Sequence, residues 1–108
     1  MRYDPVLAAL VATGSRFIVV GSNAVRDPEA VPRDLDLLAL DSPGNRASVL
    51  AGLAAVNARW GTCQGRPVSE AGPTPNWMWT VATDVGPVDV FWQFANGTRY
   101  EDAVRWQP

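Results

Sequence analysis

The stretch that decides the fold is Pro32-Arg33-Asp34-Leu35-Asp36-Leu37-Leu38-Ala39-Leu40, residues 32–40. A run of aliphatic residues this short predicts a buried strand over 35–40 rather than a helix. Asp34 leads into this strand and lies two residues before Asp36, so the two side chains are expected on one face. Two carboxylates on an otherwise apolar strand repel each other and are costly to desolvate. They therefore call for a positive partner, either arginine or a metal ion.

A third acidic residue has similar surroundings. Asp89 stands among apolar neighbours in Pro87-Val88-Asp89-Val90-Phe91. If that strand lies beside the first, all three carboxylates meet. Oxygen ligands in a chain without histidine suit a hard cation, so Asp34, Asp36 and Asp89 are predicted to bind Mg²⁺ or Mn²⁺. Taken singly, each acid also fits a structural interpretation, such as a charge that blunts an edge strand.

A candidate phosphate-binding turn precedes the acids. Phe17-Ile18-Val19-Val20 has the composition of a strand buried on both faces, and Gly21-Ser22 breaks it. A turn of this kind, if it opens a helix, presents backbone N–H groups and a hydroxyl to an anion. Gly21 and Ser22 are therefore predicted to contact a phosphate, although a Gly-Ser pair after a strand is common without any function.

The remaining signals predict an alternation of helices and strands. The cap-plus-proline pairs Asp4-Pro5 and Ser42-Pro43 are predicted to begin two helices. An Asp84-Val85-Gly86 turn is predicted to join two strands as a hairpin. The predicted elements are helix 4–14, strand 17–20, a short helix at 23–26, strand 35–40, helix 43–59 stopped by Gly61, strands 77–82 and 88–94, and a helix from 100 to 106. This order predicts a one-domain α/β (α+β) protein over residues 1–108, with a small mixed sheet flanked by helices.

The charge and the amino-acid composition of the chain exclude several classes of function. The formal charge of −2 and the acidic pI weigh against a general nucleic-acid-binding surface. All nine basic residues are arginine, which binds phosphate well but is also favoured by GC-rich codons. Cys63 is the single cysteine and no histidine is present, which excludes Ser-His-Asp chemistry and an intrachain disulfide. No long apolar run predicts a membrane span, so a cytoplasmic location is expected.

Five tryptophans, at positions 60, 77, 79, 92 and 106, have two interpretations. One is a platform on which a nucleobase stacks. The other is core packing together with an apolar oligomer face. Trp77 and Trp79 share one face of the predicted strand, which favours packing or a dimer contact.

The motifs Arg16–Val25, Pro32–Leu37 and Gly86–Val90, in that order, resemble the minimal nucleotidyltransferase superfamily. The resemblance is closest to the branch that includes abortive-infection and toxin–antitoxin nucleotidyltransferases. It implies the nucleotidyltransferase (polymerase-beta-like) fold. Those proteins carry a Gly-Gly or Gly-Ser turn after the first strand, an Asp-x-Asp motif on the second and a third acid on a later strand.

The resemblance implies a metal-dependent enzyme that moves a nucleoside monophosphate from a nucleoside triphosphate to a hydroxyl of RNA, protein or a small molecule. Asp34, Asp36 and Asp89 would be the catalytic metal ligands. Gly21 and Ser22 would bind phosphate, with Arg33 as a further phosphate contact or an ion-pair partner of the acids. Such a protein would serve in a toxin–antitoxin or phage-defence system, as a homo-oligomer or with a cognate partner. The alternative is a catalytically degenerate binding module of the same fold, acting as an antitoxin-like or regulatory subunit.

Overall fold

The computed structural model describes residues 2–20, 34–61, 65–70 and 77–105 of the 108. Within these ranges it is a small mixed α/β domain with three helices and a five-stranded mixed sheet. The elements follow one another as α1 (Asp4–Ala12), β1 (Phe17–Val20), β2 (Leu35–Ala39), α2 (Pro43–Ala55), β3 (Arg59–Trp60), β4 (Met78–Thr83), β5 (Gly86–Phe91) and α3 (Tyr100–Arg105). The predicted short helix at 23–26 lies outside the described residues.

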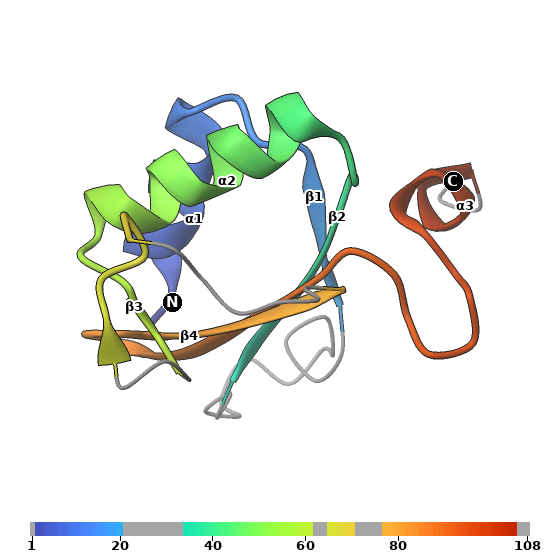
Figure 1. The fold of residues 1–108 in the computed structure, drawn as a ribbon. Coiled ribbons are helices and arrows are strands. Elements are labelled where there is room, and N and C mark those ends of the chain that lie inside the picture. Colours follow the sequence, from blue (N-terminus) through green and yellow to red (C-terminus); the bar gives the residue numbers. More distant parts are fainter. Residues whose placement is uncertain (1, 21–33, 62–64, 71–76, 106–108) are drawn as a thin grey trace.

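The sheet has the strand order β1-β2-β5-β4-β3 (Figure 1). β2 and β5 run parallel as neighbours, and the other three pairings are antiparallel. The α2–β3–β4 segment separates β2 from β5 in the sequence, as a parallel connection requires. The strand of Asp89 therefore lies beside the strand of Asp36, which was the condition for their carboxyls to meet.

Helices α1 and α2 pack together over one face of the sheet (Figure 1). The core between them and the sheet contains Val6 and Leu10 of α1, Val49 and Leu53 of α2, and every second strand residue, such as Leu37. Full burial of one such side chain stabilises the fold by about 1.5–3 kcal/mol. The two helices approach closely at Gly52, where an added Cβ would lie 2.9 Å from the Leu10 Cδ2 atom.

The predicted caps are correct for α2 and wrong for α1. The Ser42 side chain accepts a hydrogen bond from the Asn45 backbone N–H at 3.1 Å, as a helix cap should. At α1 the cap position is Tyr3, no side chain caps the helix, and Asp4 is its first residue. The Asp4 charge in the first turn still has the favourable sign for the helix dipole.

The end of α2 corrects a second prediction, since the helix ends at Ala55 rather than near Arg59. Asn57 adopts a left-handed conformation with φ of 57°. Its N–H donates to the Ala54 carbonyl, while the Ala58 N–H donates to the Leu53 carbonyl. This is a Schellman motif with asparagine in place of the expected glycine. It releases Arg59 and Trp60 to pair with β4 as β3.

The hairpin between β4 and β5 is confirmed, with a tight turn of two residues, Asp84 and Val85. Gly86 begins β5 with φ of +137°. A Cβ at this position would collide with the Tyr3 hydroxyl, so glycine is needed both for the backbone angle and for the space. The predicted strand 88–94 is therefore shifted, because pairing starts at Gly86 and ends at Phe91.

The first strand is less covered than predicted. All four residues of β1 are only partly buried, because β1 is an edge strand rather than a central one. Its apolar composition reflects packing of Phe17 and Val19 against the core. The last helix, α3, forms from residue 100 as predicted and lies beside the sheet near β1 (Figure 1).

Candidate functional site

Asp36 and Asp89 lie opposite each other on the two parallel neighbours β2 and β5. Leu35 and Leu37, which flank Asp36, belong to the core beneath the helices, as do Val88 and Val90, which flank Asp89. Because successive side chains of a strand alternate between faces, both carboxyls are on the sheet face opposite α1 and α2. The fold therefore brings together two acids that lie 53 positions apart in the sequence.

The two carboxyl groups are within hydrogen-bonding reach of each other, and this contact lowers the pKa of Asp36 and raises that of Asp89. Partial burial raises the pKa of both groups, and for Asp89 the charge of Asp36 raises the pKa further. Two carboxylates in contact cannot both ionise without strong repulsion. The pair is therefore a place where negative charge is disfavoured unless a cation accompanies it.

Asp34 lies immediately before β2 and is exposed. Its negative charge raises the pKa of Asp36 and, more weakly, that of Asp89. It is thus close enough to act electrostatically on both members of the pair. Asp34 therefore acts on the predicted cluster through its charge, while Asp36 and Asp89 contact each other directly.

The other three predicted site residues, Gly21, Ser22 and Arg33, lie outside the described residues. Their predicted contact with phosphate, and the predicted pairing of Arg33 with the acids, stay predictions. Cys63 and Trp106 also lie outside the described residues.

The acid pair offers oxygen donors of the kind that a hard divalent cation prefers. Mg²⁺ is commonly held by one or two carboxylates, with water and substrate phosphate completing its six ligands. Asp36 and Asp89 supply two such carboxylates in contact, and a cation would offset both the burial and the neighbouring negative charges that raise their pKa. Among the described residues, however, no three acids or cysteines are close enough to form a complete protein cage for a metal. Two carboxylates therefore form the best-supported part of the predicted metal site.

Thr80 is a residue of this site that the sequence motifs did not single out. It lies on β4 directly opposite Asp89, and its hydroxyl donates a hydrogen bond to the Asp89 carboxyl, which lowers the pKa of that group. The signal was present in the alternation of β4, where Trp79 and Val81 face the core. It could be used only once β4 was known to lie beside β5.

Three of the tryptophans are core residues. Trp60, Trp79 and Trp92 are at most 5% exposed and contact one another edge to face, with ring centroids 5.4 and 4.7 Å apart. The Arg46 guanidinium lies 4.5 Å from the centroid of the Trp92 ring. This arrangement matches the core-packing interpretation for these three residues. Trp77 differs, because it is 56% exposed.

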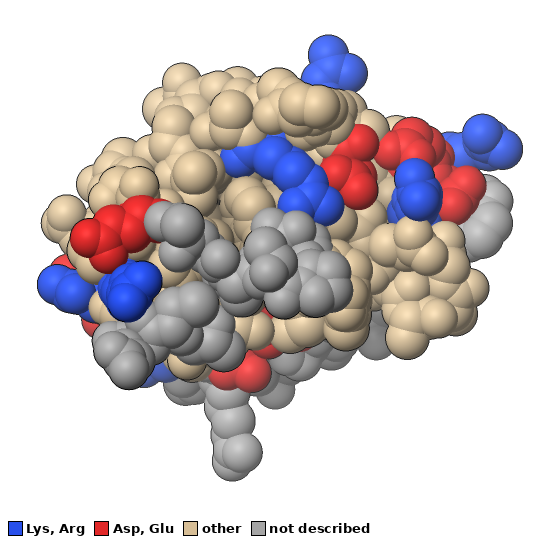
Figure 2. Space-filling model, in the orientation of Figure 1, with Lys and Arg blue, Asp and Glu red and all other residues tan. Residues whose placement is uncertain are grey.

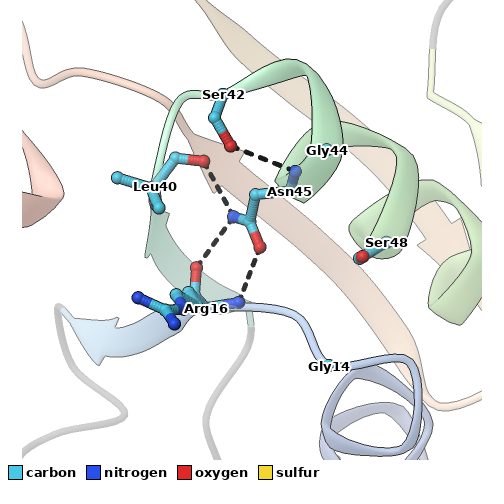
Figure 3. Close-up of a pocket in the computed structure, with 7 residues that line it drawn as sticks. All are labelled: Gly14, Arg16, Leu40, Ser42, Gly44, Asn45 and Ser48. Atoms are coloured by element: carbon cyan, nitrogen blue, oxygen red, sulfur yellow. Dashed lines mark hydrogen bonds between the residues drawn. The ribbon is translucent and has the colours of Figure 1, made fainter.

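A hollow of about 420 Å³ lies at the start of α2, and the residues that line it include neither acid of the pair (Figure 3). The buried Asn45 holds its wall together. The Asn45 amide accepts a hydrogen bond from the Arg16 N–H at 2.7 Å and donates to the Arg16 and Leu40 carbonyls at 3.0 and 2.7 Å. Because these backbone groups use both amide N–H donors of the side chain, Asn45 joins α2 to β1 and β2 and has a structural role.

The face of the molecule in Figure 2 mixes the two signs of charge. Basic and acidic side chains lie interspersed among the described residues, without a broad basic surface.

In the part of the chain that the structure describes, no helix combines the length and the apolar character needed to cross a bilayer. Comparisons of the chain with protein-family models, with curated proteins and with solved structures found no match.

Proposed function

We propose that the protein is a metal-dependent nucleotidyltransferase, which moves a nucleoside monophosphate from a nucleoside triphosphate to a hydroxyl group. The observation that carries this proposal is the contact between the Asp36 and Asp89 carboxyls across two parallel strands, with the charge of Asp34 beside them. A polymerase-beta-like fold is part of the same proposal. It is supported by a mixed sheet with helices on one face and the acids on the other.

In the proposed reaction the acceptor hydroxyl oxygen attacks the α-phosphorus of the triphosphate. A new phosphorus–oxygen bond forms, the bond between the α-phosphorus and the bridging oxygen breaks, and pyrophosphate leaves. Mg²⁺ or Mn²⁺, when bound, would lower the pKa of the attacking hydroxyl and offset the charge on the phosphates.

The protein's own residues would bind the cation, accept the proton and bind the triphosphate. Asp36 and Asp89 would hold the cation, with Asp34 adding negative charge at the entrance of β2. On the strength of the sequence resemblance, Asp89 is also proposed to accept the proton of the attacking hydroxyl. Gly21, Ser22 and Arg33 are proposed to bind the triphosphate, on the strength of the sequence resemblance.

The proposal is tested first by thermal unfolding with each nucleoside triphosphate, in Mg²⁺ and in EDTA. We expect a rise in Tm that needs both Mg²⁺ and nucleotide and disappears in the Asp34→Ala/Asp36→Ala double variant. The matched control is Asp84→Asn, which removes one acid from the exposed hairpin turn. Absence of a shift with every nucleotide would contradict the proposal and favour the alternative of a catalytically degenerate, partner-binding module.

Incubation with α-labelled nucleoside triphosphates and a cell extract then identifies the acceptor. Transfer of label to RNA, to a protein or to a small molecule separates the three acceptor classes. The double variant should transfer no label. Nucleotide binding with no transfer in any extract would support the degenerate module.

A further inference from the structure

Thr80 lies on the acid face of the sheet, between the edge strand β3 and the acid pair. In the register of β4 with β5 it is the direct partner of Asp89. Its neighbours Trp79 and Val81 are buried beneath the helices, and alternation therefore directs the Thr80 side chain toward the face that carries the carboxyls.

Gly61 restricts the orientation of the Thr80 side chain. The Gly61 N–H donates to the Thr80 carbonyl at 2.8 Å, which brings the end of β3 against β4. A Cβ atom at Gly61 would lie only 2.9 Å from Thr80 Cγ2. The methyl group of Thr80 therefore occupies the space that the missing Gly61 side chain leaves.

This packing determines where the hydroxyl points. β-Branched side chains are stiff at χ1, so fixing one branch of Thr80 fixes the other. With the methyl group against Gly61, the hydroxyl donates to the Asp89 carboxyl on the opposite side. The carboxyl is thereby tied from one side by Thr80 and from the other by Asp36.

We propose that Thr80 is a positioning residue, whose hydroxyl holds the Asp89 carboxyl beside that of Asp36 so that the two bind a divalent cation together. This inference rests on the proposed function for the identity of the ligand. A side chain that hydrogen-bonds to a metal-binding carboxylate holds that carboxylate in the orientation that binds the metal, and loss of such a side chain typically lowers metal affinity by about 10–100-fold.

Two substitutions of Thr80 distinguish the effect of its hydroxyl group from the effect of its branched shape. Thr80→Val keeps the branched outline and the contact with Gly61 but removes the donor. Thr80→Ser keeps the donor and removes only the methyl group. The control is Thr98→Val, which makes the same chemical change in the segment before α3.

The experiment measures Mn²⁺ binding to the full chain by isothermal titration calorimetry, together with crystal structures of the metal-free wild type and Thr80→Val. We expect Thr80→Val to bind Mn²⁺ about 10–100-fold more weakly, with the Asp89 carboxyl rotated away from Asp36. Thr80→Ser should retain most of the affinity, and Thr98→Val should match the wild type. Thermal unfolding of each variant in EDTA verifies that it is folded.

Unchanged Mn²⁺ affinity in Thr80→Val, or an Asp89 carboxyl that stays in place, would overturn the role of Thr80 while leaving the proposed function intact. A wild-type protein that binds no Mn²⁺ would instead overturn the proposed function. In that case the position of Asp89 in the two crystal structures still decides whether Thr80 orients it.

Discussion

Replacing Asp36 by asparagine should make the metal-free protein more stable. Burial and the negative charge of Asp34 raise the pKa of the Asp36 carboxyl, while its hydrogen-bonding contact with Asp89 lowers that pKa. Asparagine has the same outline and can still hydrogen-bond to Asp89, but it carries no charge. The substitution therefore removes repulsion from the pair without opening a cavity.

The size of the effect follows from Coulomb's law. Two unit charges 4 Å apart repel by about 1 kcal/mol in water and about 4 kcal/mol at an effective dielectric constant near 20. Both side chains are only half-buried, so solvent screens them and the lower part of this range applies. We expect Asp36→Asn to raise the free energy of unfolding by about 1 kcal/mol at pH 7, or Tm by about 4–8 °C for a domain of this size.

The assay is thermal unfolding in EDTA from pH 7 to pH 4, with Asp84→Asn as the charge-matched control. A carboxyl with a raised folded-state pKa favours folding fully below its ordinary value of 3.8, and this contribution is lost as the pH rises through the raised pKa. The advantage of Asp36→Asn should therefore be largest at pH 7 and shrink toward pH 4. A variant less stable than the wild type at pH 7 would refute the reasoning, because Asp36 would then be paired with a positive group. Saturating Mg²⁺ should reverse the order, since a ligand at 100 times its Kd adds about 2.7 kcal/mol to the wild type alone.

Three further predictions concern the scaffold. Gly52→Ala should lower the free energy of unfolding by about 1–3 kcal/mol, because the close approach of α1 leaves no room for a methyl group. Gly44→Ala, whose added Cβ meets no atom within 4 Å, should raise the free energy of unfolding by up to ~1 kcal/mol. Urea unfolding of both variants measures the two changes, and equal effects would contradict the prediction. Asn45→Ala should cost about 2–4 kcal/mol in the same assay, because three partly buried backbone groups lose their partner. A loss below about 0.5 kcal/mol, a small surface effect, would show that water replaces the amide. Arg46→Gln should lower the free energy of unfolding by only about 0.5–1 kcal/mol at pH 7. The Arg46 guanidinium lowers the pKa of Asp41, so part of this loss should vanish as the pH falls through that lowered pKa. A loss that does not change with pH would mean that it comes from the contact of Arg46 with the tryptophans alone.

Most of the secondary structure could be predicted from local signals. Ser42 and the proline after it marked the start of α2, the 17–20 run marked β1, and the Asp84-Val85 turn marked the hairpin. The end of α2 could not be predicted in this way, because Asn57 takes the left-handed position that glycine usually occupies. That choice depends on pairing of Arg59 and Trp60 with β4, which is a long-range interaction.

The sequence was sufficient to predict which acidic residues belong to the site, but not how they are arranged in space. Asp36 and Asp89 each stood out, since a carboxylate between apolar strand residues is costly to desolvate unless something compensates it. Their contact depended on whether β2 and β5 were neighbours, and a sequence does not state which strands pair. The alternation of β4 gave Thr80 a face, but an isolated threonine in a strand is ordinary, so its role emerged only from the pairing of β4 with β5.

The sequence by itself therefore determined the alternation of helices and strands and the oxygen-only chemistry of the acids, and it excluded histidine chemistry and an intrachain disulfide. The tertiary structure alone decided that β5 lies between β2 and β4, and this order places Asp89 between Asp36 and Thr80. The physical reason is that local preferences act over a few residues of the chain. The contact between the two carboxyls instead depends on sheet pairing and on burial of the opposite face beneath α1 and α2.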